Sequence, residues 1–176
     1  MTDSLFRKDR RKAETDLDSL YQKICAYVSK IRSNTLPEDL AEWNVQILYV
    51  ANDLEHIGDI VVNATNLARK FVQGGTEFSG EGMRELELMY HKADNSLSLA
   101  LQAFETLNKD LATQVIKEHP KILRFENELR YNHFERIRRG NEKTIATSGI
   151  HLDLIESLLR TENHAMNIAY VVLGMV

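Results

Sequence analysis

The sequence predicts an all-α protein, an antiparallel bundle of about five long helices. Only 8 Gly and 2 Pro occur among 176 residues, so long stretches run without a helix breaker. Within those stretches apolar residues recur at spacings of three and four, which is the period of an amphipathic helix. No segment alternates apolar and polar residues as a strand would. The connections between the stretches are short and polar, which favours antiparallel neighbours.

The first expected helix covers residues 11–32 and follows a basic cluster, FRKDRRK, at residues 6–12. A basic cluster in this position is typical of a solvated helix start, and the alternative is attraction to anionic lipid. Ser33 and Asn34 end the helix. Its apolar side is formed by Leu17, Leu20, Ile24, Tyr27 and Ile31.

The second expected helix opens at a capping box, Thr35 with Glu38, has Pro37 in its first turn and runs to about Val72. It carries a heptad seam of the kind that packs one helix on another. The seam is Leu40, Trp43, Ile47, Val50, Leu54, Ile57, Val61, Ala64, Ala68 and Phe71.

Three further helices are expected after the glycine-containing linker at residues 74–82. They cover residues 83–107, 111–139 and 144–173. Asp110 is placed to cap the middle one. Pro120 lies inside that helix and is expected to kink or split it. Gly140 and Asn141 end it.

An oxygen-rich stripe runs along the second helix, where Asn52, Glu55, Asp59 and Asn63 are three or four residues apart and share one face. This face points away from the heptad seam, so we expect it at the bundle surface. The ordinary interpretation is a solvated face. The first helix carries a second pair with the same spacing, Glu14 and Asp18.

Several functional classes are disfavoured by the sequence. A net charge of −4 argues against general nucleic-acid binding. There is no run of 18 apolar residues and no apolar signal-peptide region. Serines close to histidines, such as Ser148 and His151, lie at a helix start with no apparent acid partner, and Gly74-Gly75 lacks the residues of a phosphate-binding loop. No catalytic constellation is therefore expected.

Arginines cluster in the fourth expected helix and could meet an anion. Glutamates are interspersed with them, so paired surface charge is the favoured interpretation. The arginines are Arg124, Arg130, Arg136, Arg138 and Arg139, and the glutamates are Glu126, Glu128 and Glu135.

An internal repeat appears when residues 54–64 are set beside residues 158–168. Leu, Asn and small residues coincide at the same offsets, and both segments lie late in a long helix. We predict a truncated first repeat of two helices at residues 1–73 and a second repeat of three helices at residues 79–176. The first helix of repeat one is then missing.

The repeated segments resemble a known family. LEHIGDIVVNA resembles the signature of the PhoU family, and LLRTENHAMNIA resembles its second copy. AETDLDSLYQKI and DLATQVIKEHPKIL resemble the helices that precede the two copies, so the resemblance covers about residues 12–174. It implies two three-helix bundles packed side by side and a role in phosphate uptake and its signalling.

The resemblance also implies a cation site, because some PhoU-like proteins bind metal ions on surface acidic pairs of this spacing. Glu14 with Asp18, and Glu55 with Asp59, match that pattern. Their oxygens suit a surface-bound divalent or iron ion. The second repeat departs from it: Leu159 and Asn163 stand where the acids would be, and His119 and Leu123 replace the acids of the preceding helix. His164 keeps the family's histidine position, and the nearby Glu162 is expected either to find a partner or to reach solvent.

The resemblance implies a non-enzymatic regulatory domain. A shortened PhoU-like region occurs as the cytoplasmic tail of bacterial sodium/phosphate cotransporters, and the missing helix, basic cluster and abrupt start match that arrangement. The expected location is the cytoplasmic face of the plasma membrane, with a transmembrane transporter region of the same or another chain as partner.

Two alternatives remain. The first is a freestanding, cytoplasmic PhoU-type regulator, which is compatible with a homodimer. The second is a carboxylate-bridged metalloprotein. Such proteins use inward-pointing Glu with Glu-x-x-His. Glu14 and Glu55 lie at outer positions with no such motif in register, which disfavours it.

Overall fold

A computed structural model describes residues 2–32 and 37–176, and all its regular elements over those ranges are helices. The helices are α1 (Thr2–Arg32), α2 (Glu38–Gln73), α3 (Gly80–Thr106), α4 (Lys109–Arg138), α5 (Glu142–Ala146) and α6 (Ser148–Leu173). The predicted all-α class is confirmed. Five of the six are long, and α5 is a single short turn between α4 and α6.

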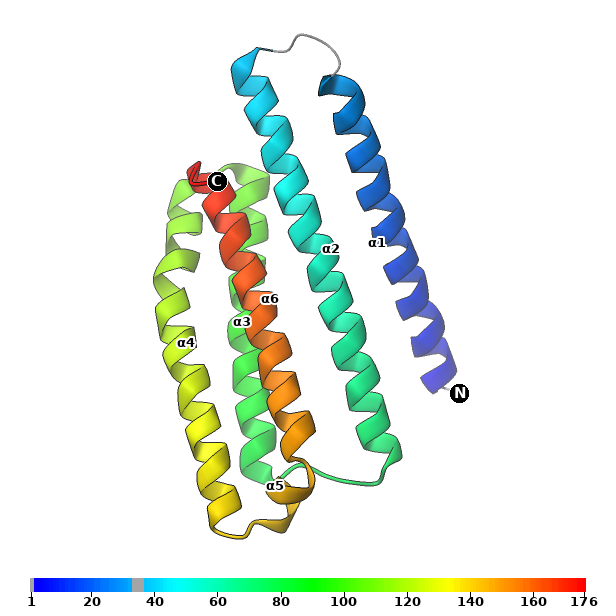
Figure 1. Cartoon of the computed structure of the whole chain (residues 1–176), viewed down its shortest axis with the longest axis vertical. Helices are drawn as coiled ribbons and strands as arrows, with labels where there is room; N and C mark the ends of the chain where they lie inside the picture. The colour runs from blue at the N-terminus through cyan, green and yellow to red at the C-terminus, as the bar shows by residue number, and fades with distance from the viewer. Residues whose placement is uncertain (1, 33–36) are drawn as a thin grey trace.

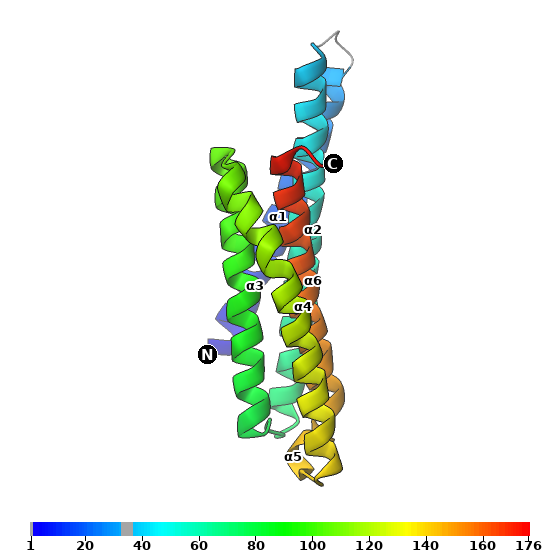
Figure 2. The same cartoon turned by 90° about the vertical axis from the view of Figure 1, so that its left-hand side faces the viewer.

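The long helices run side by side, with α6 at the centre (Figure 1). α6 packs against α2, α3 and α4, and α3 also packs on α4. α1 packs along the side of α2 that faces away from α6, and this pair extends beyond the upper end of α6 (Figures 1 and 2). α3, α4 and α6 thus form a three-helix bundle, and α1 with α2 forms a helical hairpin on its flank.

Several helix boundaries differ from those expected. α1 begins at Thr2, so the basic cluster at residues 6–12 lies inside the helix and not ahead of it. The capping box expected at Thr35 and Glu38 lies outside the side chains that the structure describes, and α2 begins directly after Pro37. α4 continues past Pro120, so the proline does not split it.

The caps of the later helices explain the other differences. Ser79 caps α3, because its hydroxyl accepts from the amide of Gly82 at 3.1 Å. Asn108, and not Asp110, caps α4, since its Oδ1 accepts from the amides of Asp110 and Leu111 at 2.9 and 3.2 Å. The fifth expected helix is divided at Thr147, which ends α5 and whose carbonyl accepts the His151 amide of α6.

The core consists of two clusters of buried side chains. The larger one joins α2, α3, α4 and α6 and is rich in alanine, which lets the helices approach closely. It contains Val50, Ile57, Ala100, Ala103, Ala112, Val115, Ala165, Ile168, Ala169, Val171 and Val172. The smaller one lies nearer α5 and contains Leu86, Met89, Ile122, Leu129 and Ile155.

The expected seams are only partly buried. On α2, Val50 and Ile57 are buried, but Leu40 and Val61 are exposed, and Ile60, which lies off the seam, is buried. α2 has a helix on each of two sides, so its buried surface is not the single stripe that a heptad predicts. On α1, Leu20 and Tyr27 are likewise exposed. Among the side chains described for this helix, the buried apolar one is Val28.

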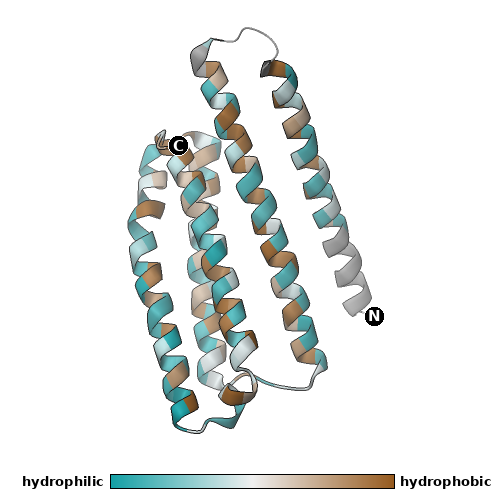
Figure 3. Cartoon of the chain, in the orientation of Figure 1, coloured by the Kyte–Doolittle hydropathy of each residue, from teal (hydrophilic) through white to brown (hydrophobic). Residues whose placement is uncertain are grey.

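Over the residues that Figure 3 colours, hydrophilic and hydrophobic residues are interspersed along every long helix. Over the described residues, none of the helices combines the length and apolar character needed to cross a bilayer.

Candidate functional site: a polar helix contact, a buried polar network and an apolar groove

The two acidic pairs, Glu14 with Asp18 on α1 and Glu55 with Asp59 on α2, lie at the surface, as expected. Glu14 and Glu55 are partly buried, and Asp18 and Asp59 are exposed. Glu55 contacts the ring of His56, with Oε2 and Nδ1 3.1 Å apart. Within the described part of the chain, no three His, Cys, Asp or Glu side chains are grouped to hold a metal ion. The cation site on these four acids stays a prediction.

A polar contact joins the two repeated segments, and the sequence analysis did not identify its central acid. Asp53 of α2 is buried, and its Oδ1 lies 2.7 Å from Nδ1 of His164 on α6. Asn167 also donates to this oxygen, at 3.2 Å. His56 lies against His164, with 5.4 Å between ring centroids. Asp53 directly precedes the seam residue Leu54, a position from which side chains often pair across helices, and this is the signal that could have found it.

Another pair, Glu162 with His119, joins α6 to α4. Glu162 is fully buried, and its Oε2 lies 2.7 Å from Nδ1 of His119. Burial raises the pKa of the Glu162 carboxyl, although the contact with His119 opposes this. The expectation that Glu162 finds a partner is confirmed. Its counterpart in the first repeat is Gly58, where a Cβ would lie 2.4 Å from Cδ2 of Leu17, so that glycine lets α1 approach α2.

A larger network of buried polar groups lies where α3, α4 and α6 meet near α5. The Arg136 guanidinium donates to both carboxylate oxygens of Glu85, each at 2.6 Å. Nε2 of His151 lies 3.1 Å from the carbonyl of Gly82 and 3.6 Å from Glu85. The ring of His133 stacks on His151 at 4.9 Å.

The two stacked histidines do not form a catalytic triad with the nearby serine. Ser148 contacts Nε2 of His133 at 2.8 Å, but Nδ1 of His133 is buried without a hydrogen-bond partner among the described residues. The expectation that His151 has no acid neighbour is wrong, because Glu85 lies beside it. A hydrolytic serine needs its histidine oriented by an acid, and here the acid lies beside the other ring.

Burial keeps both histidines neutral at physiological pH. Desolvation, aided by neighbouring His151 and Arg136, lowers the pKa of His133 from 6.5 to about 4. Desolvation also lowers the pKa of His151. The network is therefore built around neutral imidazoles beside one buried ion pair.

Acid should destabilise the protein through His133. Between pH 6.5 and 4 the unfolded chain binds a proton at this residue that the folded chain does not, so the free energy of unfolding falls as the pH falls. The loss from this group should reach about 3–4 kcal/mol, since one pKa unit corresponds to about 1.4 kcal/mol. Urea unfolding at several pH values measures it.

His133→Gln should flatten this pH dependence, and the matched exposed change His91→Gln should leave it as it is. An unaltered slope in the His133→Gln protein would show that other groups cause the acid sensitivity.

Three of the five arginines named in the sequence are paired with glutamates, as the sequence analysis favoured. Arg130 bonds Glu126 and Glu156, and Arg138 bonds Glu135. Arg136 differs from the expectation, because it is buried and not at the surface.

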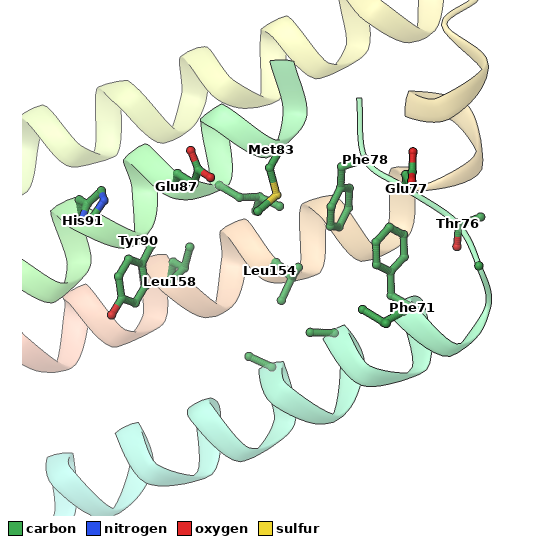
Figure 4. Close-up of a pocket in the computed structure, with 15 residues that line it drawn as sticks. Phe71, Thr76, Glu77, Phe78, Met83, Glu87, Tyr90, His91, Leu154 and Leu158 are labelled. Atoms are coloured by element: carbon green, nitrogen blue, oxygen red, sulfur yellow. The ribbon is translucent and has the colours of Figure 1, made fainter. Parts of the chain in front are cut away.

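An apolar groove of about 1050 Å³ lies between α2 and α3, over α6 (Figure 4). Leu154 and Leu158 of α6 line it between the two other helices. Phe71 and Phe78 stack at one end, with ring centroids 4.2 Å apart. The full lining is Ala64, Ala68, Phe71, Val72, Gly75, Thr76, Glu77, Phe78, Met83, Leu86, Glu87, Tyr90, His91, Leu154 and Leu158.

Comparison with known proteins agrees with this architecture. The sequence profile of the PhoU domain matches residues 86–172, from α3 to near the end of α6. This part of the chain is therefore similar to a PhoU domain. The crystal structure of PhoU from Pseudomonas aeruginosa superposes with a TM-score of 0.86 at 22% identity, over 96% of this chain and 79% of that one. The PhoU fold therefore extends over α1 and α2 as well.

Sequence relatives are of two kinds. The "Putative inorganic phosphate export protein YjbB" of Escherichia coli K12 is 26% identical over 167 residues, which are 94% of this chain and 31% of that protein. The "Phosphate-specific transport system accessory protein PhoU homolog 1" of Thermotoga maritima is 29% identical over 163 residues, 90% of this chain and 68% of that protein. This chain thus spans about a third of the length of YjbB.

Proposed function

We propose that this PhoU domain is a non-enzymatic regulator of phosphate transport and forms the cytoplasmic part of a sodium/phosphate cotransporter. The observation that carries the proposal is the match to YjbB, in which almost the whole of this chain corresponds to 31% of a much longer protein named for phosphate export. The regulated partner is then a transmembrane region, and the domain transmits its state through helix contacts.

A freestanding PhoU-type regulator is the second candidate. The Thermotoga maritima PhoU homologue supports it, since this chain covers 68% of that protein, which is named as an accessory protein of a phosphate transport system. Both candidates share the regulatory role and differ in whether the domain is joined to the transporter.

Fractionation of the native cells separates the two candidates. An antibody raised against this chain should detect a protein much larger than 176 residues in the membrane fraction. A band near the size of this chain in the soluble fraction would exclude the cotransporter and favour the freestanding regulator.

Phosphate flux tests the regulatory role itself. Removing the coding region for residues 37–176 from the native gene should leave transport of radiolabelled phosphate active but abolish its response to external phosphate. Transport that responds normally after the deletion would contradict a regulatory function, and the deletion strain carrying the intact gene is the control.

A further inference from the structure

We propose that the apolar groove between α2 and α3 binds an amphipathic helix of the transporter, with an apolar stripe toward the groove and Lys or Arg on its flanks. This inference rests on the proposed function and names its contact surface. The bound helix would lie on α2 as α3 lies on α6.

The internal repeat shows which surface of α2 is uncovered at the groove. Aligning Leu54 with Leu158 matches Val61, Ala64 and Ala68 of α2 with Ala165, Ile168 and Val172 of α6. In the second repeat, α3 and α4 pack on α6, and Ala165 and Ile168 are 0% exposed. α2 packs on α1 and α6, and no helix among the described residues stands on it as α3 stands on α6. Ala64 and Ala68, which line the groove, are partly exposed, and the neighbouring Val61, outside the lining, is 51% exposed. The uncovered surface is thus the one that a helix covers in the other repeat.

The shape of the groove fits a helix. Ala64 and Ala68 are the small residues that α2 contributes to the lining, and Gly75 lies just after the helix. Small side chains let a second backbone approach closely. The lining runs from Ala64 to Val72 on α2, a rise of about 12 Å, which corresponds to roughly two helical turns. Met83, Tyr90 and Leu158 provide apolar contact from the other two helices.

The charge of the groove selects the partner. Among the described lining residues, Glu77 and Glu87 carry formal charge at neutral pH, and both are exposed. Glu77 is paired with Lys143 at 2.8 Å, whereas Glu87 has no ion pair among those the structure gives. The Glu87 carboxylate at the edge of the groove favours a helix that carries a basic residue on the flank facing it. It disfavours an anionic lipid surface and the same groove of a second copy, because both would bring like charges together.

Photo-crosslinking in native membranes tests the contact. The full-length gene product should carry p-benzoylphenylalanine at Tyr90, which lines the groove and is 52% exposed. Tyr131 of α4, which is 67% exposed and lies outside the groove, is the matched control position. Mass spectrometry should find at least tenfold more adduct at position 90, joined to a helical segment of the transporter with an apolar stripe and basic flanks.

A charged residue in the groove should prevent the contact. Ala68→Glu should reduce the adduct at least fivefold, while Ala68→Gln, which adds similar bulk without charge, should reduce it less. Ala68 is partly exposed in a helix interior, so both variants should fold, and their thermal midpoints check this.

The alternative outcomes each overturn the proposal. An adduct between two copies of this chain at position 90 would make the groove a dimer interface. An adduct with lipid alone, or no adduct above that at position 131, would show that no transporter helix binds there. Loss of flux regulation in the deletion strain with normal regulation in the Ala68→Glu strain would overturn the groove inference and leave the proposed function standing.

Discussion

Replacing Arg136 with Met should lower the free energy of unfolding by about 3–5 kcal/mol, because breaking a buried ion pair leaves the other charge without a partner. Arg136 and Glu85 are both almost fully buried and joined by two bonds of 2.6 Å. Removing the guanidinium leaves the Glu85 carboxylate beside the neutral His151, which cannot balance its charge. Urea unfolding followed by circular dichroism measures the loss.

A double variant separates the pair from simple loss of packing. Glu85→Leu together with Arg136→Met removes both charges, and it should recover most of the lost stability. Arg138→Met, on the exposed surface of the same helix, should leave the urea midpoint nearly unchanged. A double variant as unstable as the single one would show that the network stabilises the fold by shape and not by charge compensation.

Replacing Ile168 with Ala should lower the free energy of unfolding by about 2–5 kcal/mol, the usual range for a large-to-small change in a close-packed core. Ile168 is fully buried in the cluster that joins α2, α3, α4 and α6. The surrounding helices have partners on several sides and can close only part of the cavity. Urea unfolding again measures the effect.

The matched change in the other repeat should behave differently. Ala64 is the counterpart of Ile168 on α2 and lines the open groove, so Ala64→Ile adds bulk that extends into the groove. The free energy of unfolding of the Ala64→Ile protein should stay within about 1 kcal/mol of that of the parent protein, as for most changes outside a packed core. A loss as large as that of Ile168→Ala would show that the two positions have equivalent surroundings and would remove the structural basis for an open groove.

Helix class and the number of long helices could be predicted from local pattern, because spacing of three and four follows from backbone geometry alone. The short α5 was not predicted as a separate helix. The boundaries were less certain where two residues competed for the same role. Asn108 takes the cap expected of Asp110, since its Oδ1 reaches two amides. Pro120 leaves α4 continuous, and the pattern alone left open whether it would.

The partners of the buried polar residues could not be predicted from the residue pattern of single helices. Glu162 was identified as an acid in need of a partner, but its position on one helix does not reveal that His119 lies 2.7 Å away on another. Asp53 and His164 are 111 residues apart in the chain and meet only because α2 lies along α6. The Glu85–Arg136 pair was likewise hidden among the charges of an apparently solvated helix face.

The sequence by itself determined the helices, the repeat and the PhoU resemblance, because each depends on residue order within a segment. Tertiary structure alone decided which of two equivalent apolar residues is covered. Ala165 is buried and its counterpart Val61 is exposed, since α3 packs on α6 and no described helix takes the corresponding place on α2. Burial is a property of neighbours and not of one helix, and this is why the groove is visible only in the folded chain.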